Sequence, residues 1–382
     1  MPSPDLQPAA TPPLALYVHI PFCKAKCPYC GFYSLPITNQ PVDALIHNLL
    51  AELDLYAAPE PIATIYLGGG SPACLPFNLL KHLISTLSHP APTEFTLELN
   101  PGQLSTYGLS TLRQAGVNRL SIGAQSFRQE DLTLLGRPYK PQTIVDTVLT
   151  ARQAGFDNLS LDLIYALPGS TLDHWQQTLE RAISLCPTSI SVYSLSYDPP
   201  SRFHQDLQAG RIRPLDESAD RAQYDLACKL LSDNGLQQYE LSNFALPGYR
   251  CQHNLAYWRN TPWLGLGPAG GSWYRGRRTV NIADVSTYIQ SISRGEHAFA
   301  EVEAPSPLEI ACETAVLNLR LIEGIEITSY CKYTGYDPRD LFADPLARLV
   351  GQGLLEVDDA HIRLTPAARF IADGVLAEFA SL

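Results

Sequence analysis

Short apolar runs alternate with amphipathic stretches over roughly the first 235 residues of the chain. The apolar runs have the length of buried strands and cover residues 14–20, 62–67, 94–99, 118–122, 158–164 and 189–195. Between them, apolar residues recur every three or four positions, as in residues 42–56 and 76–87, and this spacing predicts helices. Because parallel strands need a crossover segment between them, the alternation predicts an α/β fold with a parallel sheet.

A nine-residue segment at the end of one predicted helix recurs at the end of the next. Residues 113–121 read RQAGVNRLS, and residues 152–160 read RQAGFDNLS. Each copy ends a helix, places a glycine (Gly116 or Gly155) at its C-terminus and turns into a strand. The likeness could also be a coincidence between two similar turns, so the repeat supports the predicted architecture but does not establish it. We predict a sheet curled into a partial (β/α)6 barrel, with its chemistry at the carboxyl ends of the strands.

The alternation stops after residue 235. Residues 239–281 are rich in Gly, Trp and Tyr, and Pro305 and Pro307 indicate a linker. The remaining residues look helical and include a plausible hairpin at 353–365, which together suggest a winged-helix-like module. We therefore predict a disordered leader over residues 1–13, a barrel over 14–235, a connecting segment over 236–300 and a helical C-terminal domain over 301–382.

Charge and composition exclude several classes of function. The chain has 27 Lys and Arg against 38 Asp and Glu, a net charge of −11. This balance argues against a nucleic-acid partner, whose phosphates require a basic surface. From Glu301 onward there are 6 basic and 14 acidic residues, so the C-terminal module is expected to be a cap and not a DNA reader. No apolar run approaches the roughly eighteen residues of a membrane span, and residues 1–13 lack the features of a secretion signal.

Three of the nine cysteines lie on one short loop after the first predicted strand. Cys23, Cys27 and Cys30 have the spacing C-x3-C-x2-C, whereas the other six are scattered singly, which favours a reducing compartment and a cytoplasmic location. Three thiolates can hold three irons of a [4Fe–4S] cluster. Phe32 stands where a fourth cysteine would be expected, so the fourth iron is open to S-adenosylmethionine (SAM), whose reductive cleavage yields a 5′-deoxyadenosyl radical. A zinc loop or three core cysteines are the alternatives, but structural zinc prefers four ligands.

The motifs in this order resemble the radical SAM superfamily. Within it they resemble the branch that contains oxygen-independent coproporphyrinogen III oxidase (HemN) and HemW-type heme chaperones. The shared motifs are YVHIPFC at 17–23, GGGSP at 68–72, LELNPG at 97–102, SIGAQSF at 121–127 and DLIYALPG at 162–169. The likeness covers nearly the whole chain.

Two features separate the two branches. HemN oxidases resemble C-x3-C-x2-C-x-C, whereas this chain has Phe32 at the last position, as HemW proteins do. Residues 253–258 read HNLAYW and match the HNxxYW signature of HemW, which is associated with heme binding through its histidine. The resemblance therefore implies three ligands of the chain: a [4Fe–4S] cluster, SAM and heme.

The resemblance also implies a set of residues that contact SAM. These are Tyr17, Tyr29, Gly69, Gly70, Ser71, Glu98, Gln125, Arg137, Asp162 and, more weakly, Ser196. Glycines let the backbone approach a ligand closely, although a tight turn would need them equally. Arg137 would pair with the SAM carboxylate, and a surface salt bridge is its alternative role. Tyr29 would pack against the adenine or the cluster, or simply shield it.

His253 is the implied heme ligand, although a lone histidine is more often a structural hydrogen-bonding group. Aromatic residues nearby offer flat apolar surfaces for a porphyrin: Tyr257, Trp258, Trp263 and Trp273. Arg275, Arg277 and Arg278 would either neutralise heme propionates or form a solvated turn. Cys251 is a second potential ligand, with a free core thiol as the alternative. Gly271 stands where the family commonly has a histidine, which puts a second heme ligand in doubt.

We expect a heme chaperone that hands heme to an acceptor hemoprotein, plausibly of the respiratory chain. The first rival is an enzyme that oxidatively decarboxylates coproporphyrinogen III, and the second is a silent scaffold that binds neither cluster nor heme. The retained SAM residues favour the enzyme, whereas Phe32 and His253 favour the chaperone. The resemblance leaves open whether SAM is cleaved, whether heme is held covalently, whether the chain forms a homodimer and whether it associates transiently with a membrane.

Overall fold

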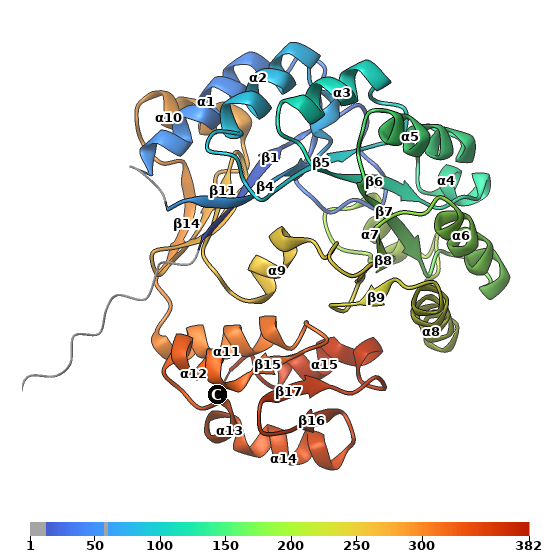
Figure 1. Ribbon diagram of the computed structural model, residues 1–382, viewed down its shortest axis with the longest axis vertical. Coiled ribbons are helices and arrows are strands. Elements are labelled where there is room, and N and C mark those ends of the chain that lie inside the picture. The colour runs from blue at the N-terminus through green and yellow to red at the C-terminus, as the bar shows by residue number, and fades with distance from the viewer. Residues whose placement is uncertain (1–12, 57–59, 382) are drawn as a thin grey trace, which may run out of the picture.

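Six parallel strands in chain order form the centre of the sheet (Figure 1). The computed structural model describes residues 13–56 and 60–381, so the predicted leader lies almost wholly outside the described residues. The strands are β1 (Leu14–Ile20), β4 (Ile62–Gly69), β5 (Glu94–Leu99), β6 (Arg119–Gln125), β7 (Asn158–Tyr165) and β8 (Ser189–Ser194). All six were predicted within three residues at each end, because each is an apolar run buried on both faces. The partial (β/α)6 barrel is confirmed.

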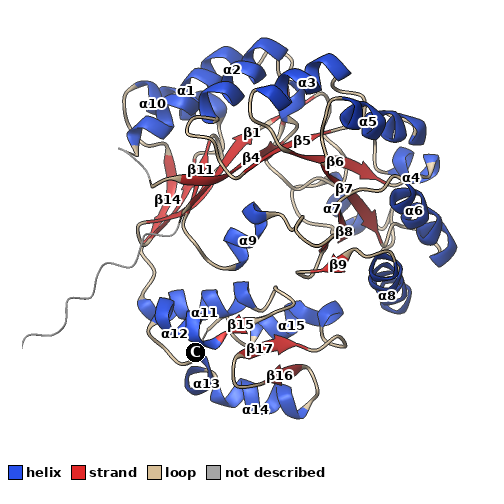
Figure 2. Cartoon of the chain, in the orientation of Figure 1, coloured by secondary structure: helices blue, strands red, loops and turns tan. Residues whose placement is uncertain are grey.

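Helices cover the outer face of the curved sheet (Figure 2). They are α1 (Val42–Leu55), α2 (Phe77–Leu87), α3 (Thr106–Gln114), α4 (Gln129–Leu134), α5 (Pro141–Gln153), α6 (Leu172–Ser184) and α8 (Glu217–Asp233). Helix α7 (Arg202–Gln208) instead lies against the cysteine loop, where its Phe203 N–H donates to the Pro28 carbonyl at 2.9 Å. The apolar side of α1, with Leu45 and Leu49, is fully buried against the sheet. The repeated segments end α3 and α5 as predicted, since Gly116 and Gly155 have φ of +121° and +89°, which glycine adopts without strain.

The strands that follow residue 235 join the same sheet at its two edges. Next to β1 lie β11 (Trp263–Leu266), which is parallel to it, and then β12 (Gly271–Tyr274), β13 (Arg277–Asn281) and β14 (Phe299–Glu303). Next to β8 lie β10 (Asn243–Ala245) and β9 (Gln237–Gln238). Helix α10 (Val285–Ser293) packs on α1. These short strands have no clear alternation, so the sequence pattern did not predict that the connecting segment extends the sheet.

The C-terminal module has its own apolar core. Its helices are α11 (Pro307–Asn318), α12 (Ile327–Thr334), α13 (Pro338–Leu341), α14 (Ala343–Gly351) and α15 (Ala372–Ala377). Its sheet has the order β15 (Ile325–Glu326), β17 (His361–Leu364), β16 (Leu355–Val357). The last two strands form the predicted hairpin, so the winged-helix-like combination of helices and a terminal hairpin is present.

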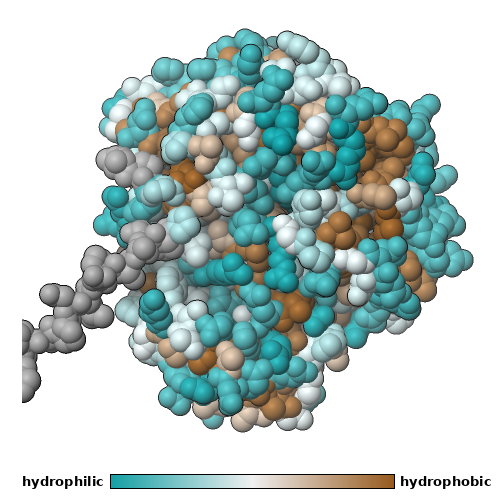
Figure 3. Space-filling view, in the orientation of Figure 1, coloured by the Kyte–Doolittle hydropathy of each residue, from teal (hydrophilic) through white to brown (hydrophobic). Residues whose placement is uncertain are grey.

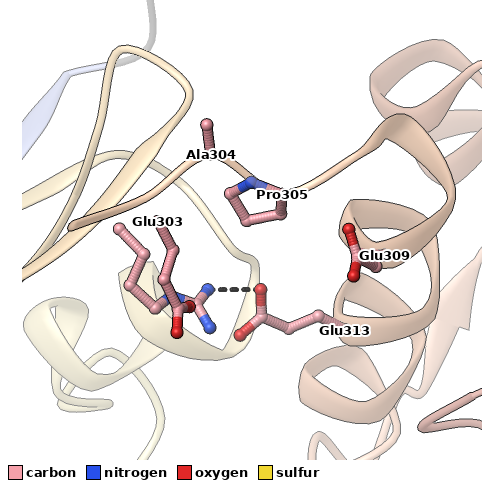
Figure 4. A pocket seen from close by; sticks show the side chains of 6 residues that line it. Glu303, Ala304, Pro305, Glu309 and Glu313 are labelled. Atoms are coloured by element: carbon pink, nitrogen blue, oxygen red, sulfur yellow. Dashed lines mark hydrogen bonds and ion pairs between the residues drawn. The ribbon is translucent and has the colours of Figure 1, made fainter. Parts of the chain in front are cut away.

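The chain crosses from the barrel to the module at residues 303–307, where Pro305 lies beside an ion pair between Arg278 and Glu313 (Figure 4). Ser306 and Glu309 form a capping box that fixes the start of α11. A second contact joins residues 239–241 to the module: Leu241 N–H donates to the Arg320 carbonyl at 3.1 Å, and Ile322 N–H donates to the Tyr239 carbonyl at 3.1 Å. Further hydrogen bonds link the two parts, from Trp273 Nε1 to the Tyr333 hydroxyl and from Arg369 Nη1 to Gln238 Oε1, each at 3.1 Å.

The face of the molecule in Figure 3 is mostly hydrophilic, and its apolar residues form scattered patches. Among the described helices, none has the length and apolar character needed to cross a bilayer.

Candidate functional site

A cavity of about 1140 Å³ lies inside the curved sheet and reaches the loops at the carboxyl ends of the strands. Its wall includes Cys23, Cys27 and Cys30 together with residues from β4 through β8. The volume is slightly above the usual range for small-molecule sites, about 300–1,000 Å³. The cavity therefore brings the predicted cysteine loop and most of the predicted SAM residues together.

The three cysteines are held by a short strand pair outside the main sheet. Cys23 ends β2 (Phe22–Cys23), which pairs with β3 (Leu35–Pro36), and the Cys30 N–H donates to the Cys27 carbonyl at 3.2 Å. Burial, reinforced by the other two thiols, raises the pKa of Cys23 to about 11. The thiol would therefore lose its proton only when a metal binds, since metal coordination deprotonates a thiol.

The donor set fits an iron–sulfur cluster better than a single ion. Among the described residues, no three His, Cys, Asp or Glu side chains converge on a point where one metal ion would bind. A four-iron cluster does not need such convergence, because each thiolate binds a different iron. Phe32, at the position of the absent fourth cysteine, is 71% exposed and also borders the cavity.

The glycine segment after β4 is fastened directly to the strand that carries Cys23. Gly70 N–H donates to the Ile20 carbonyl and Ser71 N–H donates to the Phe22 carbonyl, each at 2.8 Å. A Cβ on Gly70 would lie 2.5 Å from the Phe22 oxygen, so no other residue fits there without a shift. These two N–H groups are used within the protein and are not available to a ligand.

Arg137 is half-buried at the cavity wall and forms no ion pair among the described residues, so the structure does not show the alternative of a surface salt bridge. Its Nη1 donates to Asn100 Oδ1 at 2.6 Å, and its Nη2 donates to the Tyr29 hydroxyl. The guanidinium also lies 5.5 Å from the centre of the Tyr29 ring, and within the described chain its Nε has no hydrogen-bond partner. A guanidinium that faces the cavity without a carboxylate partner suits an anionic ligand group. Tyr29 therefore positions Arg137 in addition to lining the cavity.

Two half-buried carboxyl groups, Glu98 and Asp162, line the cavity. The Tyr66 hydroxyl donates to Glu98 Oε1 at 2.7 Å, and the Ser121 hydroxyl donates to Asp162 at 3.0 Å. Burial raises the pKa of Glu98 to about 7 and also raises the pKa of Asp162. Both groups are placed to accept hydrogen bonds from ligand hydroxyls.

The structure does not bring every predicted SAM residue to the cavity wall. Ser196 and Ser71 border the cavity, whereas Tyr17 and Gln125 lie behind it. The Tyr17 hydroxyl pairs with His19 Nδ1 at 3.0 Å, and Gln125 is buried with φ of +65°. A strand residue alternates between the two faces of the sheet, and a motif match does not reveal which face it takes.

His253 lies on α9 (Gln252–Trp258) and is buried, with 1% of its surface exposed. Its Nδ1 pairs with Thr64 Oγ1 at 2.9 Å, its Nε2 pairs with the Tyr257 hydroxyl at 3.0 Å, and its ring stacks on Tyr66 at 5.2 Å. Burial, followed by the nearby Arg119, lowers the pKa of His253 to about 3, so the imidazole is neutral. It does not border the cavity, but its neighbour Asn254 does.

The other residues named around His253 are dispersed. Arg278 pairs with Glu313 and lies over Trp273, while Arg275 and Arg277 are exposed. The Cys251 thiol is fully buried and donates to Glu94 Oε1 at 3.4 Å, and burial raises its pKa to about 12. The structure therefore places Cys251 as a core thiol.

Sequence reasoning missed several polar residues that line the cavity, among them Arg119, Tyr139 and Asn243. Arg119 is the first residue of β6 and lies at the amino end of the strand. It was missed because functional residues were expected at the carboxyl ends of the strands. The Tyr139 hydroxyl donates to the Gly123 carbonyl at 2.6 Å. Tyr139 follows Arg137 by two residues, and this proximity to a predicted SAM residue could have marked it as a cavity residue.

Comparisons with known proteins agree with this geometry. The model of the radical SAM superfamily matches residues 17–182, and the model of the HemN C-terminal domain matches residues 306–371. The chain is 33% identical to heme chaperone HemW of Bacillus subtilis, over 95% of this chain and 98% of the relative. It is 34% identical to heme chaperone HemW of Escherichia coli, over 96% of this chain and 98% of that protein.

Among solved structures, coproporphyrinogen III oxidase (HemN) from Escherichia coli has a similar fold. Its TM-score is 0.83 at 24% identity, and the match covers 97% of this chain and 90% of the oxidase. At that identity the likeness concerns the fold.

Proposed function

Because the chain belongs to the HemW family of radical SAM proteins, we propose that it is a heme chaperone. It binds heme through the α9 segment, holds a SAM-bound [4Fe–4S] cluster in the cavity and passes heme to an acceptor hemoprotein. A respiratory-chain protein is the acceptor we favour, and the cytoplasm is the compartment, consistent with nine free cysteines. The observation that carries the proposal is that Asn254 of the HNxxYW segment borders the same cavity as the three cysteines.

The residues of the cavity support this assignment of ligands. Cys23, Cys27 and Cys30 would hold the cluster, and the open iron would bind the amino and carboxylate groups of SAM. Arg137 would neutralise the carboxylate, while Glu98 and Asp162 would accept hydrogen bonds from the ribose hydroxyls. When bound, the cluster supplies one-electron reduction, and the buried cavity wall keeps bulk water away from it.

The heme assignment rests on His253, whose neutral imidazole has the form that coordinates iron. The histidine is buried in the present conformation, so ligation requires a change in the position of α9.

The second candidate is the oxidation of coproporphyrinogen III, which the fold similarity to HemN and the intact set of cavity carboxyl groups favour. Anaerobic incubation with SAM, a reductant and coproporphyrinogen separates the two functions. We expect no protoporphyrinogen, and its formation together with methionine would replace the chaperone with the enzyme. A scaffold that binds neither ligand would show no iron or sulfide after reconstitution.

The first experiment is an anaerobic heme titration followed by Soret absorbance. The protein is compared with His253→Ala and, as a control, with His82→Ala, which removes an exposed histidine of α2. We expect saturable one-to-one binding that His253→Ala weakens and His82→Ala does not. If His253→Ala binds heme as tightly as the unchanged protein, the heme site lies elsewhere in the chain. Absence of specific heme binding would refute the chaperone function.

A further inference from the structure

The N-terminus of α9 is fastened to the sheet by one buried carboxylate. Glu94, the first residue of β5, accepts the Gln252 N–H through Oε2 and the His253 N–H through Oε1, both at 3.0 Å. The first N–H groups of a helix have no partner within it, so an acceptor here directly stabilises the docked helix. Oε1 also accepts the Cys251 thiol at 3.4 Å. Glu94 thus fixes the turn that carries His253.

In this docked position His253 has no nitrogen available for iron. An imidazole coordinates iron through the lone pair of one ring nitrogen, and that nitrogen must face open space large enough for a porphyrin. Here Thr64 occupies Nδ1 at 2.9 Å, Tyr257 occupies Nε2 at 3.0 Å, and Tyr66 covers one face of the ring. Heme therefore cannot be ligated by His253 while α9 is docked.

The C-terminal module closes the other side of the helix, and in Figure 1 α9 lies between the sheet and α11. Asn318 of α11 donates to the Trp258 carbonyl at 2.8 Å, and the Arg320 guanidinium lies 4.8 Å from the centre of the Trp258 ring. Asn260, just after the helix, donates to Thr314 at 2.9 Å. α9 is thus clamped from both sides.

Two polar atoms at the contact between α9 and the module lack a hydrogen-bond partner among the described residues. Within the described chain, Trp258 Nε1 and Asn260 Oδ1 are buried without a hydrogen-bond partner, which lowers the stability of the docked state. The module also meets the barrel at the crossing at residues 303–307, beside the pair of Arg278 and Glu313 (Figure 4), and at residues 239–241. Polar contacts such as the hydrogen bond from Trp273 to the Tyr333 hydroxyl at 3.1 Å link the two parts as well. Because the module has its own apolar core, a rigid-body movement that breaks these polar contacts would free one side of α9 without unfolding either core.

We propose that α9 is a latch: Thr64, Glu94 and the C-terminal module hold His253 in a closed state, and heme is ligated only after α9 leaves the sheet. Thr64 and Glu94 are positioning residues that act through His253. The proposal rests on the proposed function, since it presumes that His253 is the heme ligand. A ligand that binds only the open state has an apparent affinity reduced by the fraction of molecules that are open.

A substitution at Thr64 tests the latch. Thr64→Val keeps the shape of the side chain but removes the partner of Nδ1, and the loss of one hydrogen bond should raise heme affinity roughly 2- to 10-fold. Thr64→Ser keeps the hydroxyl and should behave as the unchanged protein. Thr96→Val is the matched control, because Thr96 is a buried threonine on the neighbouring strand whose hydroxyl has no partner among the described residues. It should leave heme affinity unchanged.

Hydrogen exchange on the unchanged protein gives a second readout. Heme binding should accelerate exchange of the amides of residues 252–258, two of which donate to Glu94 in the closed state. This measurement decides the question even if Thr64→Val fails to fold.

The outcomes separate the latch from the proposed function. If His253→Ala weakens heme binding but Thr64→Val has no effect and residues 252–258 stay equally protected with heme, the latch is wrong and the chaperone function stands. If heme binding is independent of His253, the heme site is elsewhere and the latch is wrong, whereas absence of specific heme binding refutes the chaperone function and the latch together. Tighter binding by Thr64→Val alone, with faster exchange in 252–258, supports the latch.

Discussion

Gly70→Ala should separate the glycine segment from the cysteine loop and abolish cluster loading. The added Cβ would lie 2.5 Å from the Phe22 oxygen and 2.8 Å from its carbon and nitrogen, all backbone atoms that cannot turn aside. Ordinary contact begins near 3.4 Å, so β4 and β2 must part by several tenths of an ångström. That movement strains the hydrogen bonds that Gly70 and Ser71 donate to the Ile20 and Phe22 carbonyls.

The expected loss in the free energy of unfolding can be summed from these contacts. Two hydrogen bonds contribute about 1 kcal/mol each, and overpacking costs about 1–3 kcal/mol, which gives about 3–5 kcal/mol in total. We expect a lower melting temperature of the cluster-free protein and, after anaerobic reconstitution, much less iron and sulfide per chain.

The matched control is Gly31→Ala, within the cysteine loop itself. A Cβ there would meet Asp198 at 3.7 Å, an ordinary contact, so loading and melting temperature should match those of the unchanged protein. If Gly70→Ala had the same iron content and melting temperature as the unchanged protein, the two segments would not be rigidly joined, and this account of the site would be refuted.

Three further predictions concern single side chains. Burial raises the pKa of Glu98 from 4.5 to about 7, so the folded state binds the proton more tightly than the unfolded state, and the free energy of unfolding falls as pH rises from 4.5 to 7. Glu98→Gln should remove about 3 kcal/mol of that decline. The same dependence of the unfolding free energy on pH in both proteins would contradict this prediction. Arg137→Lys should weaken SAM binding about 10- to 100-fold in equilibrium dialysis with unchanged iron content, because lysine lacks the planar fork, and unchanged affinity would exclude the carboxylate contact. Cys251→Ser should leave heme stoichiometry unchanged because the thiol is enclosed, and a lost Soret band would instead make Cys251 a ligand.

The sequence predicted the six central strands because burial on both faces imposes continuous apolar runs that pattern analysis detects. It also predicted that the three cysteines share a site with Ser71, Glu98 and Asp162, since parallel strands bring their carboxyl ends to one edge. Arg137, which follows α4, was implied only by the family resemblance. Gln125 and Tyr17 were placed less well. Tyr17 lies beside the cavity-lining Tyr66, with 6.3 Å between the ring centres, but its hydroxyl pairs with His19, and a motif match does not reveal such a partner. The closed surroundings of His253 were beyond prediction, since Thr64 and Glu94 come from strands far away in the chain.

Residues 252–258 join three parts of the molecule that the sequence pattern treats as separate. Asn254 borders the cavity with the cysteines, His253 contacts Thr64 on the central sheet, and Trp258 contacts the C-terminal module. Because one short helix makes all three contacts, the proposed release of α9 would change the surroundings of the histidine and the wall of the cavity together.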